Sequence, residues 1–203
     1  MTATIGVLAL QGDVREHARL LRELGVTVRP IRRADQLAGV QGLVIPGGES
    51  TTISRLAIDF GLLEPLREAV RDGLAVLGTC AGMIMLAKSI LDGRPDQETI
   101  GGLDILVRRN AFGRQVESFE TGVKIAGMSG PDFPGVFIRA PWVESAGPRV
   151  TVLARLVPSG GPGSGPGEGR IVAVRQDRIL AAAFHPELSA DSRFHSMFLS
   201  MIE

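Results

Sequence analysis

The sequence predicts an α/β fold: a mainly parallel central sheet flanked by helices on both faces, with antiparallel additions. Two observations predict it. The first half of the 203 residues alternates short apolar runs with helical patterns, which is typical of parallel strands joined by helices. The second half, from Ile105 to Phe184, contains mainly short β-type runs separated by Gly and Pro. Neither a repeat nor a linker is recognisable, so a single domain over residues 1–203 is predicted.

The first predicted strand is the apolar run Ile5–Leu10, which is continuous, as expected of a strand covered on both faces. Asp13 is predicted to cap the helix that follows, with Glu16 three residues later. In this helix, apolar residues and His17 recur at helical spacing until Gly25, which favours a helix end.

The same alternation continues to the middle of the chain. The predicted strands are Val26–Ile31, Gly42–Ile45 and Leu74–Leu77, and the predicted helices are Thr51–Phe60 and Leu62–Asp72. After them, apolar residues between Met83 and Leu91 occupy almost every side of a helical pattern, which predicts a central, buried helix.

The second half is predicted to return as strands and to end in a helix. The clearest β-type runs are Val136–Ile138, Val150–Leu156, Ile171–Val174 and Ile179–Ala183. Pro158–Gly169 holds six Gly, three Pro and two Ser in twelve residues, so we expect a flexible loop between two strands. The last helix places apolar residues on one face, namely Phe194, Met197, Phe198, Met201 and Ile202.

Composition restricts the partners and the compartment. Lys plus Arg and Asp plus Glu both total 22, so a strongly basic face for nucleic acid is not expected. The single cysteine excludes an internal disulfide, which is consistent with a reducing compartment. The first apolar run is too short for a signal peptide, and no stretch approaches the roughly 20 apolar residues that span a bilayer. We therefore expect a cytoplasmic protein without a membrane partner.

The strongest chemical signal is Gly78-Thr79-Cys80-Ala81-Gly82, between a predicted strand and a predicted helix. This is a G-x-nucleophile-x-G elbow with Cys as the nucleophile. Its glycines allow strand and helix to approach closely, and the helix N-terminus favours a thiolate. The simpler alternative is that Cys80 is a small buried apolar residue.

A cysteine nucleophile needs a base, and His185 is the candidate because Phe184-His185-Pro186-Glu187 follows a predicted strand. In an extended segment, side chains two residues apart point the same way, so Glu187 is predicted to orient the imidazole. The alternative is an ordinary strand-end turn. His17 and His195 are expected to be packed or exposed rather than catalytic.

A third signal, Pro46-Gly47-Gly48-Glu49-Ser50-Thr51-Thr52, follows the predicted strand Gly42–Ile45. Glycines at the carboxyl end of a strand let backbone N–H groups approach a ligand. The backbone at Gly48 and the amide of Ala81 are therefore the candidate oxyanion hole. The same segment is also expected to cap the next helix through Ser50 or Thr51.

These strings, in this order, resemble the glutaminase subunit of pyridoxal 5′-phosphate synthase, a class I, triad-type glutamine amidotransferase. The resemblance covers essentially the whole chain, and the elbow and His-Pro-Glu mark the superfamily. The strings that point to this branch are Gly47-Gly48-Glu49-Ser50-Thr51-Thr52 and Arg109-Asn110 with Phe112-Gly113-Arg114-Gln115. Leu10-Gln11-Gly12-Asp13 and Phe137-Ile138-Arg139-Ala140-Pro141 are also shared with the family. The resemblance implies the flavodoxin-like fold of class I glutamine amidotransferases.

The resemblance also implies residue roles. Cys80, His185 and Glu187 would form the triad, and glutamine would be bound by Gly48, Glu49, Ser50, Arg109, Ile138 and Arg139. A free amino acid needs a cation for its carboxylate and acceptors for its ammonium, and Arg139 and Glu49 are of the right types. Which group takes which end of glutamine stays open.

The implied activity is hydrolysis of L-glutamine to L-glutamate and ammonia through a cysteinyl thioester. The ammonia would pass to a synthase subunit, within a large multi-subunit complex, that makes pyridoxal 5′-phosphate from ribose 5-phosphate and glyceraldehyde 3-phosphate. The vitamer would be a product, so neither a cofactor nor a metal is expected. Gln11, near the end of the first strand, is a candidate for the coupling to the synthase.

Three alternatives remain from the sequence alone. The chain could be the glutaminase of another amidotransferase, which serves imidazole glycerol phosphate, purine or anthranilate synthesis. It could be a non-catalytic protein with a reactive cysteine, although His185 and Glu187 would then be unexplained. A flavodoxin-like nucleotide binder is disfavoured because no Gly-x-Gly-x-x-Gly or P-loop string is present.

Overall fold

The computed structural model describes residues 2–109, 118–156 and 169–202. Its strands are β1 (Thr4–Leu8), β2 (Thr27–Ile31), β3 (Gly42–Ile45), β4 (Ala75–Thr79), β5 (Ala87–Leu91), β6 (Leu103–Arg108), β7 (Ser118–Val123), β8 (Phe133–Ile138), β9 (Trp142–Ala146), β10 (Thr151–Leu156), β11 (Arg170–Gln176) and β12 (Ile179–Ala182). Its helices are α1 (Val14–Glu23), α2 (Ser50–Asp59), α3 (Leu63–Arg71), α4 (Ala81–Leu86) and α5 (Arg193–Leu199), with short 3₁₀ turns η1 (Ala34–Leu37) and η2 (Pro186–Leu188).

A ten-stranded sheet in the described part of the chain has the order β2-β1-β3-β4-β12-β11-β9-β6-β5, with β10 paired to β11. In this order, the first five strands are parallel, namely β2, β1, β3, β4 and β12. Strand β11 pairs antiparallel with β12, β9 and β10. A separate antiparallel pair joins β7 and β8. The predicted fold class is therefore confirmed.

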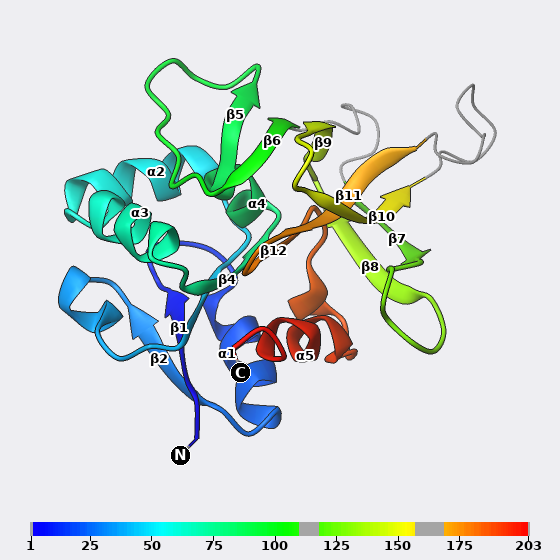
Figure 1. Ribbon diagram of the computed structural model, residues 1–203, viewed down its shortest axis with the longest axis horizontal. Helices are drawn as coiled ribbons and strands as arrows, with labels where there is room; N and C mark the ends of the chain where they lie inside the picture. Colours follow the sequence, from blue (N-terminus) through cyan, green and yellow to red (C-terminus); the bar gives the residue numbers. More distant parts are fainter. Residues whose placement is uncertain (1, 110–117, 157–168, 203) are drawn as a thin grey trace.

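Helices cover both faces of the parallel strands. Figure 1 shows α1 and α5 together on one side and α2 and α3 on the other. This coverage explains the residue pattern, because every residue of β3, β4 and β12 is buried. The strand β6, in the antiparallel half, instead alternates buried and half-buried residues. Among the described residues, no helix is long and apolar enough to cross a membrane.

One predicted element is wrong. The apolar segment from Met83 to Leu91 is not one helix: α4 ends at Leu86 and β5 begins at Ala87. Apolar residues continue on both sides of Lys88 and Ser89, so the pattern did not reveal the change; these two exposed residues lie in β5, which forms because it pairs with β6. The predicted loop Pro158–Gly169 lies outside the described residues, except for Gly169.

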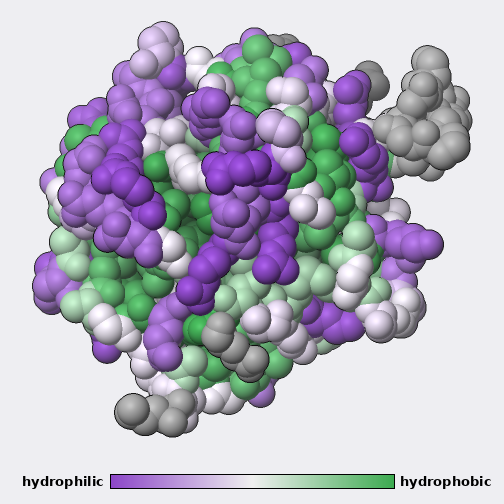
Figure 2. Space-filling model, viewed as in Figure 1, coloured by the Kyte–Doolittle hydropathy of each residue, from purple (hydrophilic) through white to green (hydrophobic). Residues whose placement is uncertain are grey.

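The surface in the view of Figure 2 is mainly hydrophilic, with smaller hydrophobic areas between the polar side chains. The apolar side chains instead fill the interior, where one cluster joins both halves of the large sheet, from Ile5 and Val7 to Ile171 and Val174. This core holds the carboxyl ends of the parallel strands at one edge, where sites of open α/β sheets form.

Candidate active site

Cys80 lies between the last residue of β4 and the first residue of α4, with a φ of 47°. This left-handed conformation turns the chain sharply from strand to helix. The flanking glycines are required by the packing: a Cβ on Gly78 would lie 2.6 Å from Leu86 Cδ1, and one on Gly82 would overlap the Ile45 carbonyl. The elbow predicted from the sequence is therefore present, with the thiol 5% exposed.

His185 follows β12, at the same sheet edge, and its backbone N–H donates to the Val136 carbonyl at 2.8 Å. Its Nδ1 lies 2.7 Å from Glu187 Oε1, so the predicted contact is present. The reason given for it was wrong, because Pro186–Leu188 is a 3₁₀ turn rather than an extended segment. The turn itself brings the carboxylate back onto the ring.

Asp13 also reaches this imidazole, which the sequence did not predict. It stands at the N-cap position of α1, but its side chain makes no capping hydrogen bond. Instead, Asp13 Oδ2 lies 3.2 Å from His185 Nδ1. The capping prediction was wrong because a local signal at a helix start cannot reveal a partner 172 positions away, in the segment that follows β12. His185 Nδ1 thus faces two carboxylates.

These neighbours fix the charge of His185. Burial lowers the pKa of His185, but hydrogen bonds with Asp13, Cys80 and Glu187 outweigh burial and raise the pKa from 6.5 to about 12. The ring is therefore an imidazolium at neutral pH. This cation lines the cavity that also holds the Cys80 sulfur.

Glu187 is completely buried behind the imidazole. Burial raises the pKa of Glu187, and its hydrogen bond with His185 opposes this effect. A carboxylate in such a position needs polar neighbours to stay ionised, because an uncompensated buried charge is unfavourable.

A cavity of about 250 Å³ opens on Cys80. Apart from buried Glu187, it gathers every residue that the sequence analysis named for the site. Its lining consists of Gln11, Asp13, Gly48, Glu49, Ser50, Cys80, Ala81, Ile84, Arg109, Ile138, Arg139 and His185. Residues from distant segments thus meet around one small space.

The backbone at Gly48 has a φ of 149°, which favours glycine. The loop is held by Gln11, whose Oε1 accepts a hydrogen bond from the Glu49 N–H at 2.7 Å. Ala81 is the first residue of α4, so its N–H has no acceptor within that helix. Both candidate oxyanion donors therefore line the cavity, beside the sulfur.

Glu49 has two partners in this site. Its carboxylate caps α2 by accepting from the Thr51 N–H and hydroxyl, at 3.3 and 3.1 Å, so the predicted capping by Ser50 or Thr51 was wrong. It also accepts from Arg109 Nη2 at 2.8 Å. Ser50 is instead the first residue of the helix, and its buried hydroxyl has no hydrogen-bond partner among the described residues.

Ile138 and Arg139 lie at the carboxyl end of β8, where Arg139 has a φ of 42°. The Ile138 carbonyl is 3.9 Å from Cys80 Sγ, so this turn forms a wall of the site beside the nucleophile. The remaining part of the Arg109 string, residues 110–115, lies outside the described residues.

A model of the SNO glutamine amidotransferase family matches residues 7–203. The chain belongs to this family. It is 58% identical over 201 residues to the pyridoxal 5′-phosphate synthase subunit PdxT of Streptomyces griseus, covering 99% of this chain and 96% of the relative. It is 59% identical over 198 residues to the protein of the same description from Frankia alni, covering 98% and 94%.

Solved structures agree. The crystal structure of a glutamine amidotransferase superposes with a TM-score of 0.86 at 47% identity, covering 98% of both chains. The family expected from the sequence strings is therefore confirmed, and so is the fold of its members.

Two buried histidines lie next to the site in positions that were not predicted from the sequence. His17 on α1 and His195 on α5 are both completely buried and meet behind Glu187. The position of His17 among the apolar residues of α1 indicated burial, but its partners come from the other end of the chain.

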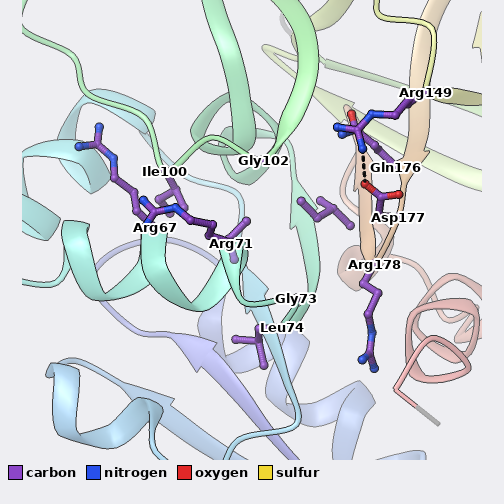
Figure 3. Close-up of a pocket in the computed structure, with 12 residues that line it drawn as sticks. Arg67, Arg71, Gly73, Leu74, Ile100, Gly102, Arg149, Gln176, Asp177 and Arg178 are labelled. Carbon is purple, nitrogen blue, oxygen red and sulfur yellow. Dashed lines mark ion pairs between the residues drawn. The ribbon is translucent and has the colours of Figure 1, made fainter.

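A larger cavity, of about 540 Å³, lies at the opposite ends of β4 and β12. Figure 3 shows several arginines around it, and the guanidinium groups of Arg67 and Arg178 point away from each other. Each already has acceptors: Arg67 binds Glu98 and the Thr99 carbonyl, and Arg178 binds the Met201 carbonyl. Arg149 pairs with Asp177 at 3.6 Å. This cavity therefore does not offer converging free cations to an anion.

Proposed function

We propose that this chain is the glutaminase subunit of a pyridoxal 5′-phosphate synthase and that Cys80, His185 and Glu187 are its catalytic triad. The observation that carries the triad is that His185, with Nδ1 2.7 Å from the buried Glu187 carboxylate, lines the same small cavity as Cys80. The identity to PdxT proteins over nearly the whole chain supports the synthase assignment.

In the first half of the reaction, the Cys80 thiolate attacks the side-chain amide carbon of glutamine. The negative charge that develops on the amide oxygen is stabilised by backbone N–H groups near Gly48 and at Ala81. The C–N bond then breaks as His185 gives its proton to the departing nitrogen, which leaves as ammonia. The product on the enzyme is a γ-glutamyl thioester.

In the second half, neutral His185 takes a proton from water as the water attacks the thioester carbon. The C–S bond breaks, which releases glutamate and restores the thiolate and the imidazolium. No redox step or added group is needed, so no cofactor and no metal is part of this mechanism, and pyridoxal 5′-phosphate is the product of the assembly.

The α-amino and α-carboxylate groups of glutamine are bound by Glu49, Ser50, Arg109, Ile138 and Arg139. The unpaired Ser50 hydroxyl and the Glu49–Arg109 pair, 2.8 Å apart, support this assignment because they offer a donor, an acceptor and a cation on one wall. Gln11 joins this wall to the loop after β1 through its bond to the Glu49 N–H, which supports a part in the coupling to the synthase.

Ammonia is expected to pass directly to the synthase subunit in a large cytoplasmic complex, because ammonia released into water is protonated and loses its nucleophilicity. The experiment measures glutamate release and pyridoxal 5′-phosphate formation, with and without the candidate synthase. Cys80→Ala should abolish both with glutamine, and added ammonium salt should restore only the vitamer. Glutamate release by Cys80→Ala, or indifference of the parent to the synthase, would contradict the proposal.

A further inference from the structure

Behind the triad, buried polar side chains from four segments form a continuous chain. His17 Nε2 lies 3.0 Å from Thr79 Oγ1 and 3.3 Å from Glu187 Oε2. On the other side of the ring, His17 Nδ1 lies 2.9 Å from His195 Nε2. None of these four side chains is exposed to solvent. The mechanism above does not use His17 or His195, so their burial needs another explanation.

Both histidines are neutral in the folded protein. Burial, reinforced by the positive charge that His195 and His185 can carry, holds the pKa of His17 well below its ordinary value. Burial alone lowers the pKa of His195 to about 4. One proton therefore lies between the two neutral rings, and its position fixes both tautomers.

If His17 donated this proton from Nδ1, two unfavourable contacts would follow. The lone pair of His17 Nε2 would face the Glu187 carboxylate at 3.3 Å. His195 would carry its hydrogen on Nδ1, a buried atom without a hydrogen-bond partner among the described residues. A buried donor without an acceptor is unfavourable, because it loses its hydrogen bond to water and gains none in return.

If His195 donates instead, both problems disappear. His195 Nε2–H binds His17 Nδ1, and the unpaired His195 Nδ1 is only an unused acceptor, which proteins tolerate more often than an unused donor. His17 then carries its hydrogen on Nε2, which faces the Thr79 hydroxyl and Glu187 Oε2.

We propose that His17 is a positioning residue of the glutaminase: its Nε2–H faces Glu187 Oε2 and keeps that carboxylate ionised and turned toward His185, while His195 fixes the required tautomer. This inference rests on the proposed function. Glu187 Oε2 has no hydrogen-bond partner among the described residues, and the hydrogen bond of His17 Nε2 is with Thr79 Oγ1. At 3.3 Å from Oε2, the polar His17 N–H therefore acts on the carboxylate through its dipole rather than through a formed hydrogen bond.

Loss of the His17 N–H would therefore change the protonation of the catalytic histidine, His185. Glu187 would take up a proton more readily, because only its interactions with His185 and its backbone hydrogen bond would then be known to oppose burial and the negative charge of Asp13, both of which raise the pKa of Glu187. A neutral Glu187 stabilises the imidazolium less, so His185 would lose its proton at lower pH. Asp13 still faces His185 Nδ1, which limits the effect to a part of the total.

Two amide substitutions make a matched test. The side chain of His17→Gln is long enough to place an N–H where Nε2 stands, whereas that of His17→Asn reaches only the position of Nδ1.

Both variants are measured as complexes with the synthase, by glutamate release from L-glutamine across a range of pH. We expect His17→Asn to lower kcat at least tenfold with KM within twofold, and to move the alkaline limb of the kcat profile to lower pH. His17→Gln should restore kcat to within about threefold of the parent, because it returns an N–H to the position that faces Glu187 Oε2.

Equal kcat values and pH profiles for the parent and His17→Asn would overturn the inference. Equal losses of kcat in the two variants, with lowered melting temperatures and unchanged pH profiles, would also overturn it. A parent complex that releases no glutamate would instead refute the proposed function. Independently of any variant, nitrogen-15 spectra of histidine-labelled parent protein should show His17 protonated on Nε2. Protonation of His17 on Nδ1 would overturn the inference even if neither variant folds.

Discussion

The buried His195 makes the stability of this protein depend on pH in a defined window. The side chain is completely buried, and burial lowers its pKa to about 4 from an ordinary value of 6.5. Between these values the unfolded chain binds a proton that the folded chain does not. Stability therefore falls as the pH drops from 6.5 toward 4, and the contribution is constant above 6.5.

The size of the effect follows from the two pKa values. The linkage relation gives a loss of about 2 kcal/mol between pH 7 and pH 5, since one pKa unit corresponds to about 1.4 kcal/mol. In a chain of this length, 1 kcal/mol moves the melting temperature by about 2–4 °C, so the expected shift is about 4–8 °C.

Other groups titrate in the same range, so the assay must isolate His195. We would compare melting temperatures of the parent and His195→Gln at pH 7 and pH 5. The glutamine keeps an N–H for His17 Nδ1 but cannot bind a proton. We expect the parent to lose about 4–8 °C more than His195→Gln on acidification.

The same substitution at His185 is the matched control, because its pKa is raised rather than lowered. The stabilisation from His185 is present in full below pH 6.5 and is lost as the pH rises toward 12. His185→Gln should therefore differ from the parent with the opposite sign. Parallel losses of stability in the parent and His195→Gln would refute the assignment of a neutral, buried His195.

Two further predictions concern the site. Asp13→Asn removes a carboxylate that raises the pKa of His185, so the alkaline limb of its kcat/KM profile should move to lower pH, whereas Asp35→Asn, on the exposed turn η1, should leave the profile unchanged. An unshifted limb in Asp13→Asn would show that Asp13 does not contribute to the charge of the imidazole. Gly82→Ala places a Cβ on the Ile45 carbonyl and should cost about 3 kcal/mol or more in a denaturant titration. A Cβ on Gly61 would meet open space, but this residue has a φ of 63°, so Gly61→Ala should lower the free energy of unfolding by only about 1–2 kcal/mol. Similar losses of stability in the two variants would contradict the packing argument.

Much of the fold was predictable because its parallel half is covered on both faces. Strands such as β3 are continuous apolar runs, and the predicted Gly42–Ile45 has the bounds that the structure gives. The prediction failed after Met83, where the buried helix α4 gives way to the partly exposed strand β5, because apolar residues lie on both sides of Lys88 and Ser89. Only the pairing of β5 with β6, a tertiary contact, decides between the two.

The site was predictable where its signal is local and not where it is long-range. The elbow at Cys80 and the pair His185–Glu187 are short strings whose geometry follows from neighbouring residues. The contact of Asp13 with His185 and that of His17 with His195 join residues far apart in the sequence. From local sequence alone, Asp13 was predicted to be a helix cap and His17 to be packed or exposed, because local sequence does not say which distant segments become neighbours in the fold.

The meeting of His17 and His195 also has a consequence for biosynthesis of the protein. The two residues are 178 positions apart, and α5 is synthesised after all the other described elements. Until α5 docks against α1, nothing fixes the proton on the ring behind Glu187. The elbow at Cys80 can therefore form before the buried polar chain behind Glu187, which is complete only when α5 has packed against α1.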